Sequence, residues 1–348
     1  MQTKTKKVVI DGSCIKSTKF NGAQRYALEI LRELDKLVPR GKYELLIRRE
    51  YKDLLCLCNI KKVEIEAKNK LIWGVKVLFY LVKNNALYIH FTNGFTLWRK
   101  SIITLHDIYA FYGMYNNTWL YNIKAKCKVI IDAIVAMHIV TVSEFSKQTM
   151  LDKLPLKPEK ISVIYNGWQH LENIESDEQI LERENLHAQS YYFFLGRLVN
   201  NKNIKWIYNV ADRNPNDYFV IAGALYNEKF DFYMGKNQNI VYTGFINDGE
   251  MKALYQKCKA FLFPSLMEGF GIPPMEALYN GAPIIISNTS SLPEIYEDSA
   301  HYIDPMKYDY CLDDLLNEPV ASPEKILSKY SWEKSAKQWY ELIEGYTN

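Results

Sequence analysis

Apolar and polar positions along this chain form short β-rich runs that alternate with longer helical stretches. In the first half the runs are four or five residues long and lie at residues 7–11, 43–47, 87–91, 102–105 and 139–142. Between the first two runs, residues 23–37 repeat apolar side chains at the helical period. Strands that alternate with helices in this way predict a parallel sheet covered by helices.

The same alternation resumes in the second half of the chain. Its β-rich runs lie at residues 191–195, 218–222, 240–242, 260–263 and 283–286. The chain has 348 residues, 48% of them hydrophobic, which is more than one ordinary core accommodates. We therefore predict an α/β protein of two Rossmann-like domains that face each other across a cleft. The first domain spans residues 1–168 and the second spans residues 169–330.

One stretch of the first domain, residues 71–82, is apolar enough to raise the question of a membrane. It is shorter than the roughly 18 residues that a membrane-spanning helix needs, and Lys76 interrupts it. Lys68, Lys70 and Lys83 flank it. Two interpretations stay open, a buried helix of the first domain and a surface that dips into lipid.

The charge distribution and the cysteines of the chain indicate its cellular compartment and its possible partners. Residues 1–160 carry 28 basic and 14 acidic side chains, a net +14, whereas the remainder carries 15 and 26, a net −11. Such asymmetry indicates either a basic face for an anionic partner or simple solubility. The six cysteines lack paired metal spacing, and the N-terminus lacks the pattern of a signal peptide. We expect a cytoplasmic protein with reduced thiols, possible peripheral contact with the inner face of an anionic membrane, and no nucleic-acid partner.

The densest chemistry lies in residues 263–278, FPSLMEGFGIPPMEAL. A strand ends near Phe263, a loop with glycines follows, and two prolines fit the first turn of a helix. The N–H groups at such a helix start bind a diphosphate, and the glycines allow it to approach closely. Glu268 and Glu276 border this position, and carboxylates accept hydrogen bonds from sugar and ribose hydroxyls.

This segment is similar to the signature of retaining family 4 glycosyltransferases of the GT-B fold, of the type that builds bacterial surface polysaccharides. The resemblance implies that Glu276 binds the ribose of the nucleotide and that Glu268 faces the hydroxyls of the donor sugar. It also implies backbone contacts to sugar and phosphate from the residues between them, Gly269, Phe270, Gly271 and Ile272.

Two further segments of the second domain resemble the same family. Residues 194–198, FLGRL, are similar to its diphosphate clamp, which makes Gly196 a donor contact and Arg197 and Lys202 the cations. Fixed cations stabilise the charge that builds on a leaving diphosphate. Phe245 and Ile246 correspond to the segment that holds the nucleobase, although an ordinary strand-to-helix turn is also consistent with them. The sequence has no Asp-X-Asp motif, so we expect no metal and no cofactor beyond the nucleotide-diphosphate sugar.

The first domain resembles the family at fewer positions. Residues 21–27, NGAQRYA, are similar to the opening of its first long helix, where Gly22 would approach the donor phosphate. His106 follows a strand and corresponds to the histidine that reaches the donor sugar, although a lone histidine at a strand end is often structural. Residues 330–333 resemble the start of the family's C-terminal helix, so residues 331–348 are expected to pack on the first domain.

Together these features predict a retaining, metal-independent glycosyltransferase. It would transfer a hexose from a nucleotide-diphosphate sugar to a saccharide or polyprenyl-linked saccharide acceptor. A nucleotide-sugar epimerase or hydrolase of the same fold and an inactive nucleotide-sugar-binding protein stay open as alternatives. A dinucleotide oxidoreductase is disfavoured because no Gly-X-Gly-X-X-Gly follows the first strand.

Overall fold

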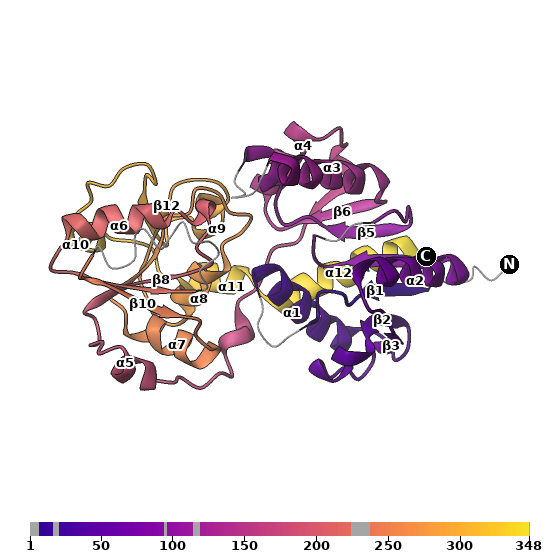
Figure 1. Ribbon diagram of the computed structural model, residues 1–348, viewed down its shortest axis with the longest axis horizontal. Helices are drawn as coiled ribbons and strands as arrows, with labels where there is room; N and C mark the ends of the chain where they lie inside the picture. The colour runs from indigo at the N-terminus through magenta and orange to yellow at the C-terminus, as the bar shows by residue number, and fades with distance from the viewer. Residues whose placement is uncertain (1–6, 17–20, 94–95, 114–118, 224–236, 348) are drawn as a thin grey trace. The chain divides into compact units, whose positions relative to one another are not determined.

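The chain divides into two compact units, each built on its own parallel sheet (Figure 1). The computed structural model describes residues 7–16, 21–93, 96–113, 119–223 and 237–347. Unit 1 comprises Met1–Ile108, Ile123–Gly167 and Ser331–Asn348, and unit 2 comprises Tyr109–Asn122 and Trp168–Tyr330. Residues 109–122 group with unit 2, although the sequence placed them in the first domain.

The sheet of unit 1 has seven parallel strands in the order β3-β2-β1-β4-β5-β6-β7. The strands are β1 (Val8–Asp11), β2 (Tyr43–Arg48), β3 (Lys61–Ile65), β4 (Leu87–His90), β5 (Ser101–Thr104), β6 (His138–Thr141) and β7 (Ile161–Val163). From β1 the chain first moves outward to β2 and β3, and then returns to β4 and continues in the opposite direction. The direction therefore reverses between β1 and β4, which makes their carboxyl ends a topological switch point.

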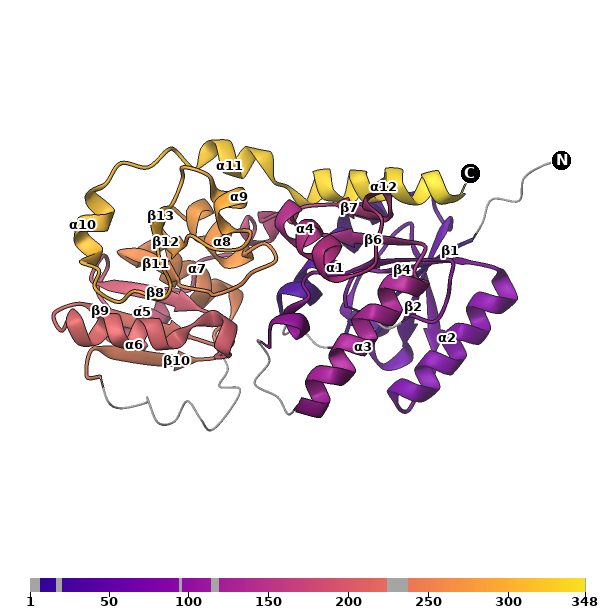
Figure 2. The same cartoon turned by 90° about the horizontal axis from the view of Figure 1, so that it is seen from above.

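Helices cover both faces of this sheet. The helix α1 (Gly22–Leu37) packs against α12 (Trp332–Thr347), and the indole N–H of Trp339 donates to the Tyr26 hydroxyl at 2.6 Å. Figure 2 shows α12 on one face of the sheet, with α2 (Lys70–Asn84) and α3 (Trp119–Val135) on the other. The expectation that the C-terminal helix packs on the first unit is therefore met by the contact between α12 and α1. The helix α4 (Glu144–Lys153) links β6 to β7.

The sheet of unit 2 has six parallel strands in the order β10-β9-β8-β11-β12-β13. The strands are β8 (Tyr191–Leu195), β9 (Tyr218–Ala222), β10 (Ile240–Gly244), β11 (Ala260–Phe263), β12 (Ile284–Ser287) and β13 (His301–Ile303). The helices are α5 (Gln179–Arg183), α6 (Ile204–Arg213), α7 (Asp248–Lys257), α8 (Ile272–Tyr279), α9 (Leu292–Tyr296), α10 (Leu312–Asn317) and α11 (Glu324–Lys329). The switch point of this sheet lies between β8 and β11, whose following helices lead in opposite directions.

The apolar stretch at residues 71–82 belongs to α2, and its surroundings correct the interpretation as a buried helix. Only Trp73, Val77 and Leu81 are buried within α2, where they pack against the sheet. The other apolar side chains of this helix are exposed to differing degrees. Among the described residues, no helix combines the length and the apolar character that crossing a bilayer requires.

Candidate active site

Most of the predicted donor-binding residues of unit 2 lie in the loops that follow its central strands β8 and β11. The strands β8 and β11 are neighbours, and their chains turn away from each other at the carboxyl ends. In open parallel sheets a ligand binds at this reversal, because the two departing loops leave space there. The loop after β8 carries Gly196, Arg197 and Lys202, and the loop after β11 carries Glu268.

The loop after β11 is tied down before it reaches α8. The backbone N–H of Glu268 donates to the Ser290 hydroxyl at 3.0 Å, and the Ser291 hydroxyl donates to the Glu268 carbonyl at 3.1 Å. Gly271 precedes α8 with a φ of +90°, and a Cβ there would lie 2.8 Å from a methyl of Leu292. This position therefore requires glycine. Gly269 and Phe270 are buried in the same loop, as is Ile272 at the start of α8.

Two of the predicted catalytic residues contact each other directly. Lys202 Nζ lies 2.7 Å from Glu268 Oε1 and 4.5 Å from the centre of the Phe263 ring. The Glu268 side chain is 9% exposed, so its carboxylate is buried beside the cation. An ammonium group has three N–H donors. Lys202 can thus hold Glu268 and still donate to a phosphate oxygen.

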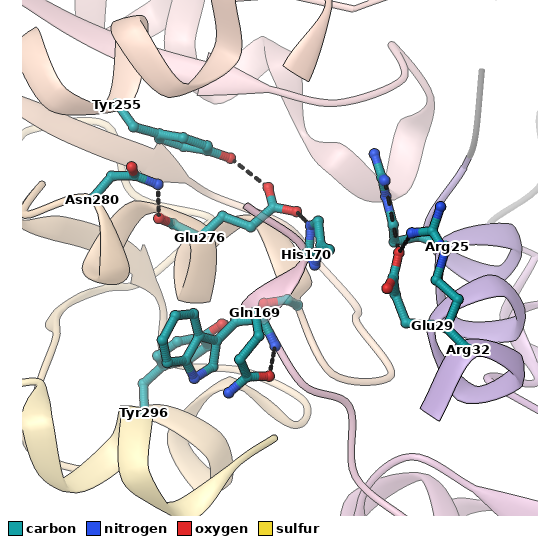
Figure 3. Close-up of polar contacts among 11 residues, drawn as sticks. Arg25, Glu29, Arg32, Gln169, His170, Tyr255, Glu276, Asn280 and Tyr296 are labelled. Atoms are coloured by element: carbon teal, nitrogen blue, oxygen red, sulfur yellow. Dashed lines mark hydrogen bonds and ion pairs between the residues drawn. The ribbon is translucent and has the colours of Figure 1, made fainter. Parts of the chain in front are cut away.

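Glu276 is held by two residues that the sequence analysis did not identify. Its Oε1 lies 2.8 Å from His170 Nε2, and its Oε2 accepts from the Tyr255 hydroxyl at 2.9 Å (Figure 3). Burial, followed by the nearby Glu276 charge, raises the pKa of Tyr255 well above its ordinary value, so the phenol remains a hydrogen-bond donor. Both carboxylate oxygens of Glu276, which is predicted to bind the ribose, are therefore held in place.

No local signal marks His170 or Tyr255. His170 stands in the polar connection after Trp168, where a single histidine has no pattern, and Tyr255 lies within α7 like an ordinary core aromatic. His170 is separated from Glu276 by 106 positions and Tyr255 by 21. Only the packing of the 3-10 turn at Gln169–Leu171 and of α7 near α8 brings these side chains to one carboxylate.

The loop after β8 is shaped by two glycines. The Gly196 N–H donates to the Ala222 carbonyl at 3.0 Å, which continues the pairing of β8 with β9. Gly223 has a φ of +137°, and a Cβ there would overlap the carbonyl of Gly196. Arg197 follows as an exposed side chain. The loop therefore presents a cation at the carboxyl end of the sheet, on a backbone that close packing holds in place.

The predicted nucleobase segment lies at the end of the edge strand β10. Phe245 is 55% exposed, and Ile246 is buried. Asn247 then begins α7 with a capping box, in which its side chain accepts from the Glu250 N–H at 2.9 Å and Glu250 accepts from the Asn247 N–H at 2.8 Å. The cap lies three residues after the end of β10, and it fixes the backbone that follows Phe245 and Ile246.

Gly22 and His106, the remaining predicted residues, belong to unit 1. A Cβ at Gly22 would meet nothing within 4 Å, so packing does not explain a glycine at the start of α1. The helix begins with a capping box between Asn21 and Gln24, and the Gln24 side chain also donates to the Cys14 carbonyl at 3.2 Å. Gln24 thus has a structural role at the start of α1.

His106 is packed among backbone and aromatic groups. Its backbone N–H donates to the Asn93 side chain at 2.9 Å, its ring Nε2 lies 3.1 Å from the Phe91 carbonyl, and its ring meets the Tyr26 ring edge-on at 4.9 Å. Because a carbonyl only accepts, Nε2 carries the proton and Nδ1 is left as an acceptor. Burial lowers the pKa of His106 to about 4, so the imidazole is neutral at neutral pH.

Two units with parallel sheets, each with a switch point, give this protein the GT-B fold. Residues 176–308 match the family described as glycosyl transferases group 1. The matched part of the chain includes the four charged residues of the predicted donor site, Arg197, Lys202, Glu268 and Glu276. This region of unit 2 is accordingly a glycosyl transferases group 1 domain.

Three similar proteins illustrate the match. The O-antigen chain mannosyltransferase RfbU of Salmonella typhimurium is 28% identical over 219 residues, which cover 60% of this chain and 58% of that protein. The serotype-specific mannosyltransferase WbdA of Escherichia coli is 52% identical over 62 residues, which cover 17% of this chain and 8% of that protein. The structure of Anabaena HepE in complex with UDP and glucose has a TM-score of 0.73 at 14% identity and covers 97% of this chain and 99% of that chain. The alignments with RfbU and WbdA thus cover less than two thirds of the length of those curated relatives.

Proposed function

We propose that this protein is a retaining glycosyltransferase that transfers mannose from a nucleoside-diphosphate sugar to a saccharide or polyprenyl-linked saccharide. The observation that carries the proposal is the pair of buried carboxylates, Glu268 and Glu276, in a glycosyl transferases group 1 domain. Each is held in a fixed direction, one by a cation and the other by two hydrogen-bonding side chains. The names of RfbU and WbdA support mannose as the sugar and a polysaccharide as the product.

The site residues divide the work of the reaction between binding and charge stabilisation. We assign Glu276 to the ribose hydroxyls and Glu268, together with His106, to the hydroxyls of the sugar. Arg197 and Lys202 neutralise the diphosphate as it leaves, because fixed cations in a partly buried site stabilise developing charge strongly. Backbone N–H groups at the start of α8 bind the phosphate oxygens.

The transfer itself needs no protein nucleophile. The acceptor hydroxyl oxygen forms a bond to the anomeric carbon while the bond from that carbon to the phosphate oxygen breaks. The proton of the acceptor passes to an oxygen of the leaving diphosphate, so atoms and charge balance without a metal. In a retaining transfer, the new bond forms on the same face of the sugar from which the diphosphate leaves.

Incubation of the purified protein with a panel of nucleoside-diphosphate sugars tests the proposal. The panel should vary base and sugar independently, with mannosyl and polyprenyl-linked saccharides as acceptors and mass spectrometry as the readout. We expect a mannosylated product with the anomeric configuration of the donor, formed equally well in EDTA. Complete conversion of the donor without acceptor would instead establish an epimerase or hydrolase, and nucleotide binding without turnover would establish an inactive binding protein.

A further inference from the structure

The helix α2 is apolar on two opposite faces, and the described part of the chain covers one of them and leaves the other exposed. Trp73, Val77 and Leu81 form the inner face and pack against the sheet of unit 1. Six large apolar side chains form the outer face, with exposures from 36% to 77%. They are Leu71, Ile72, Val75, Leu78, Phe79 and Val82.

The spacing of these residues makes the outer face a continuous stripe. Leu71, Val75, Phe79 and Val82 follow one another at intervals of four, four and three, which aligns them along one side of a helix. A helix that is apolar all round is normally buried on all sides. A contiguous apolar surface of this kind marks an interaction site rather than an ordinary solvated face.

The charged side chains of α2 itself are all positive. The helix α2 contains Lys70, Lys76 and Lys83 and no acidic residue, and Lys68 stands just before it. Two carboxylates also line a groove of about 730 Å³ beside α2, Glu64 in β3 and Glu66 just after that strand.

Those two carboxylates are already paired with cations of unit 1. Arg49 lies 3.6 Å from Glu64 and 2.6 Å from Glu66, and Lys52 lies 3.3 Å from Glu64. The lysines along α2 therefore keep a net positive charge next to the apolar stripe.

The neighbouring helix α3 extends the same character over this side of unit 1. The crossovers from β3 to β4 and from β5 to β6 run in the same direction, and right-handed crossovers therefore place α2 and α3 on one face. Figures 1 and 2 agree with this arrangement. On α3, Ile134 is 60% exposed and Lys124 is exposed. The one acidic residue of this helix, Asp132, is buried and lies 2.9 Å from Lys128.

We propose that the outer face of α2, with the adjoining lysines, is a docking surface for an anionic lipid bilayer. The apolar side chains enter the boundary between head groups and acyl chains, while the lysine ammonium groups bind lipid phosphates at the same depth. Several basic residues together hold a protein at such a membrane reversibly. A second copy of this chain fits less well, because a symmetric contact would bring the two lysine-rich faces together.

Vesicle flotation tests this surface without donor or acceptor, so a negative result leaves the proposed reaction untouched. The full chain should float with phosphatidylcholine vesicles that contain phosphatidylglycerol, not with pure phosphatidylcholine, and high salt should release it. Val75→Ser with Phe79→Ser, and separately Lys70→Glu with Lys83→Glu, should each lower the partition coefficient at least about tenfold.

The matched control carries the same kinds of substitution in unit 2. Met306 is 67% exposed and Lys307 beside it is exposed, so Met306→Ser with Lys307→Glu should float like the unchanged protein. Thermal melts of every variant confirm folding. Equal recovery with both vesicle types, no recovery with either, or flotation unaffected by the α2 variants would overturn the proposal. So would a dimer in sedimentation that Val75→Ser with Phe79→Ser dissociates, because a second copy would then cover the surface.

Discussion

Removing the Tyr255 hydroxyl should weaken nucleotide binding, although the Tyr255 side chain is fully buried. Tyr255 donates to one oxygen of Glu276 at 2.9 Å, and His170 holds the other oxygen at 2.8 Å. After Tyr255→Phe the carboxylate keeps only one of these two contacts and can turn away from the direction needed for ribose. A hydrogen bond to a charged group contributes about 1.5 to 3 kcal/mol. Because the bond is also present in the free protein, only part of this loss falls on binding, and Kd should rise by at most about a hundredfold.

Isothermal titration of UDP and of GDP measures this effect, with Tyr191→Phe as the matched control. Tyr191 is also fully buried in unit 2, and its hydroxyl donates to the backbone carbonyl of Leu254 at 3.0 Å. Both variants lose one buried hydrogen bond, and the loss in free energy of unfolding should be smaller for Tyr191→Phe because its acceptor is a neutral carbonyl. Only Tyr255→Phe should lose nucleotide affinity. Equal Kd values for the two variants would show that the contact between Tyr255 and Glu276 serves stability alone.

Three further predictions concern charge, protonation and backbone. Lys202→Ala should remove about 2 to 4 kcal/mol of transition-state stabilisation, seen as lower kcat, whereas Lys202→Arg should retain part of it. Burial lowers the pKa of His138 to about 4 in the folded protein, from an ordinary value of 6.5. As the pH falls, the unfolded chain therefore binds the proton before the folded protein does. Stability should therefore fall by up to about 3 kcal/mol between pH 6.5 and pH 4, and denaturant titrations of His138→Asn should show a flatter pH dependence. Gly271→Ala should lower the free energy of unfolding by about 1 to 3 kcal/mol, whereas Gly22→Ala should leave unfolding unchanged and weaken donor binding.

The central strands could be predicted from the sequence because they are buried on both faces. Strands such as β8 and β11 are continuous apolar runs, and the predicted and observed bounds coincide at Tyr191–Leu195 and Ala260–Phe263. None of the predicted β-rich runs covers β3, β7 or β13. All three lie at the edge of a sheet, and β3 reads KKVEI, with charged side chains that are exposed or half-buried. An edge strand can lack the apolar run of a central strand, and then only its pairing partner identifies it.

The environment of the site could be predicted only in part, for a different reason. Glu268 and Glu276 stand in one continuous motif, which a sequence comparison detects directly. The partners that hold them come from separate elements: Lys202 from the loop after β8, His170 from a polar connection, and Tyr255 from α7. Such contacts depend on tertiary packing, which local periodicity does not encode. The outer face of α2 is a similar case, because an apolar stretch does not reveal which of its sides remains uncovered.

The return of the chain to unit 1 at Ser331 determines the order in which the protein can be completed on the ribosome. Unit 1 needs α12: Trp339 contacts Tyr26, the Ser335 hydroxyl donates to the Tyr165 carbonyl at 2.5 Å, and Trp332 occupies the space that a side chain at Gly167 would need. These contacts cannot form until the last helix has been synthesised. Domains usually fold in the order of synthesis, but here the second sheet can close before the first is finished. During that interval the apolar surface of α1 that α12 covers is exposed to chaperones and proteases.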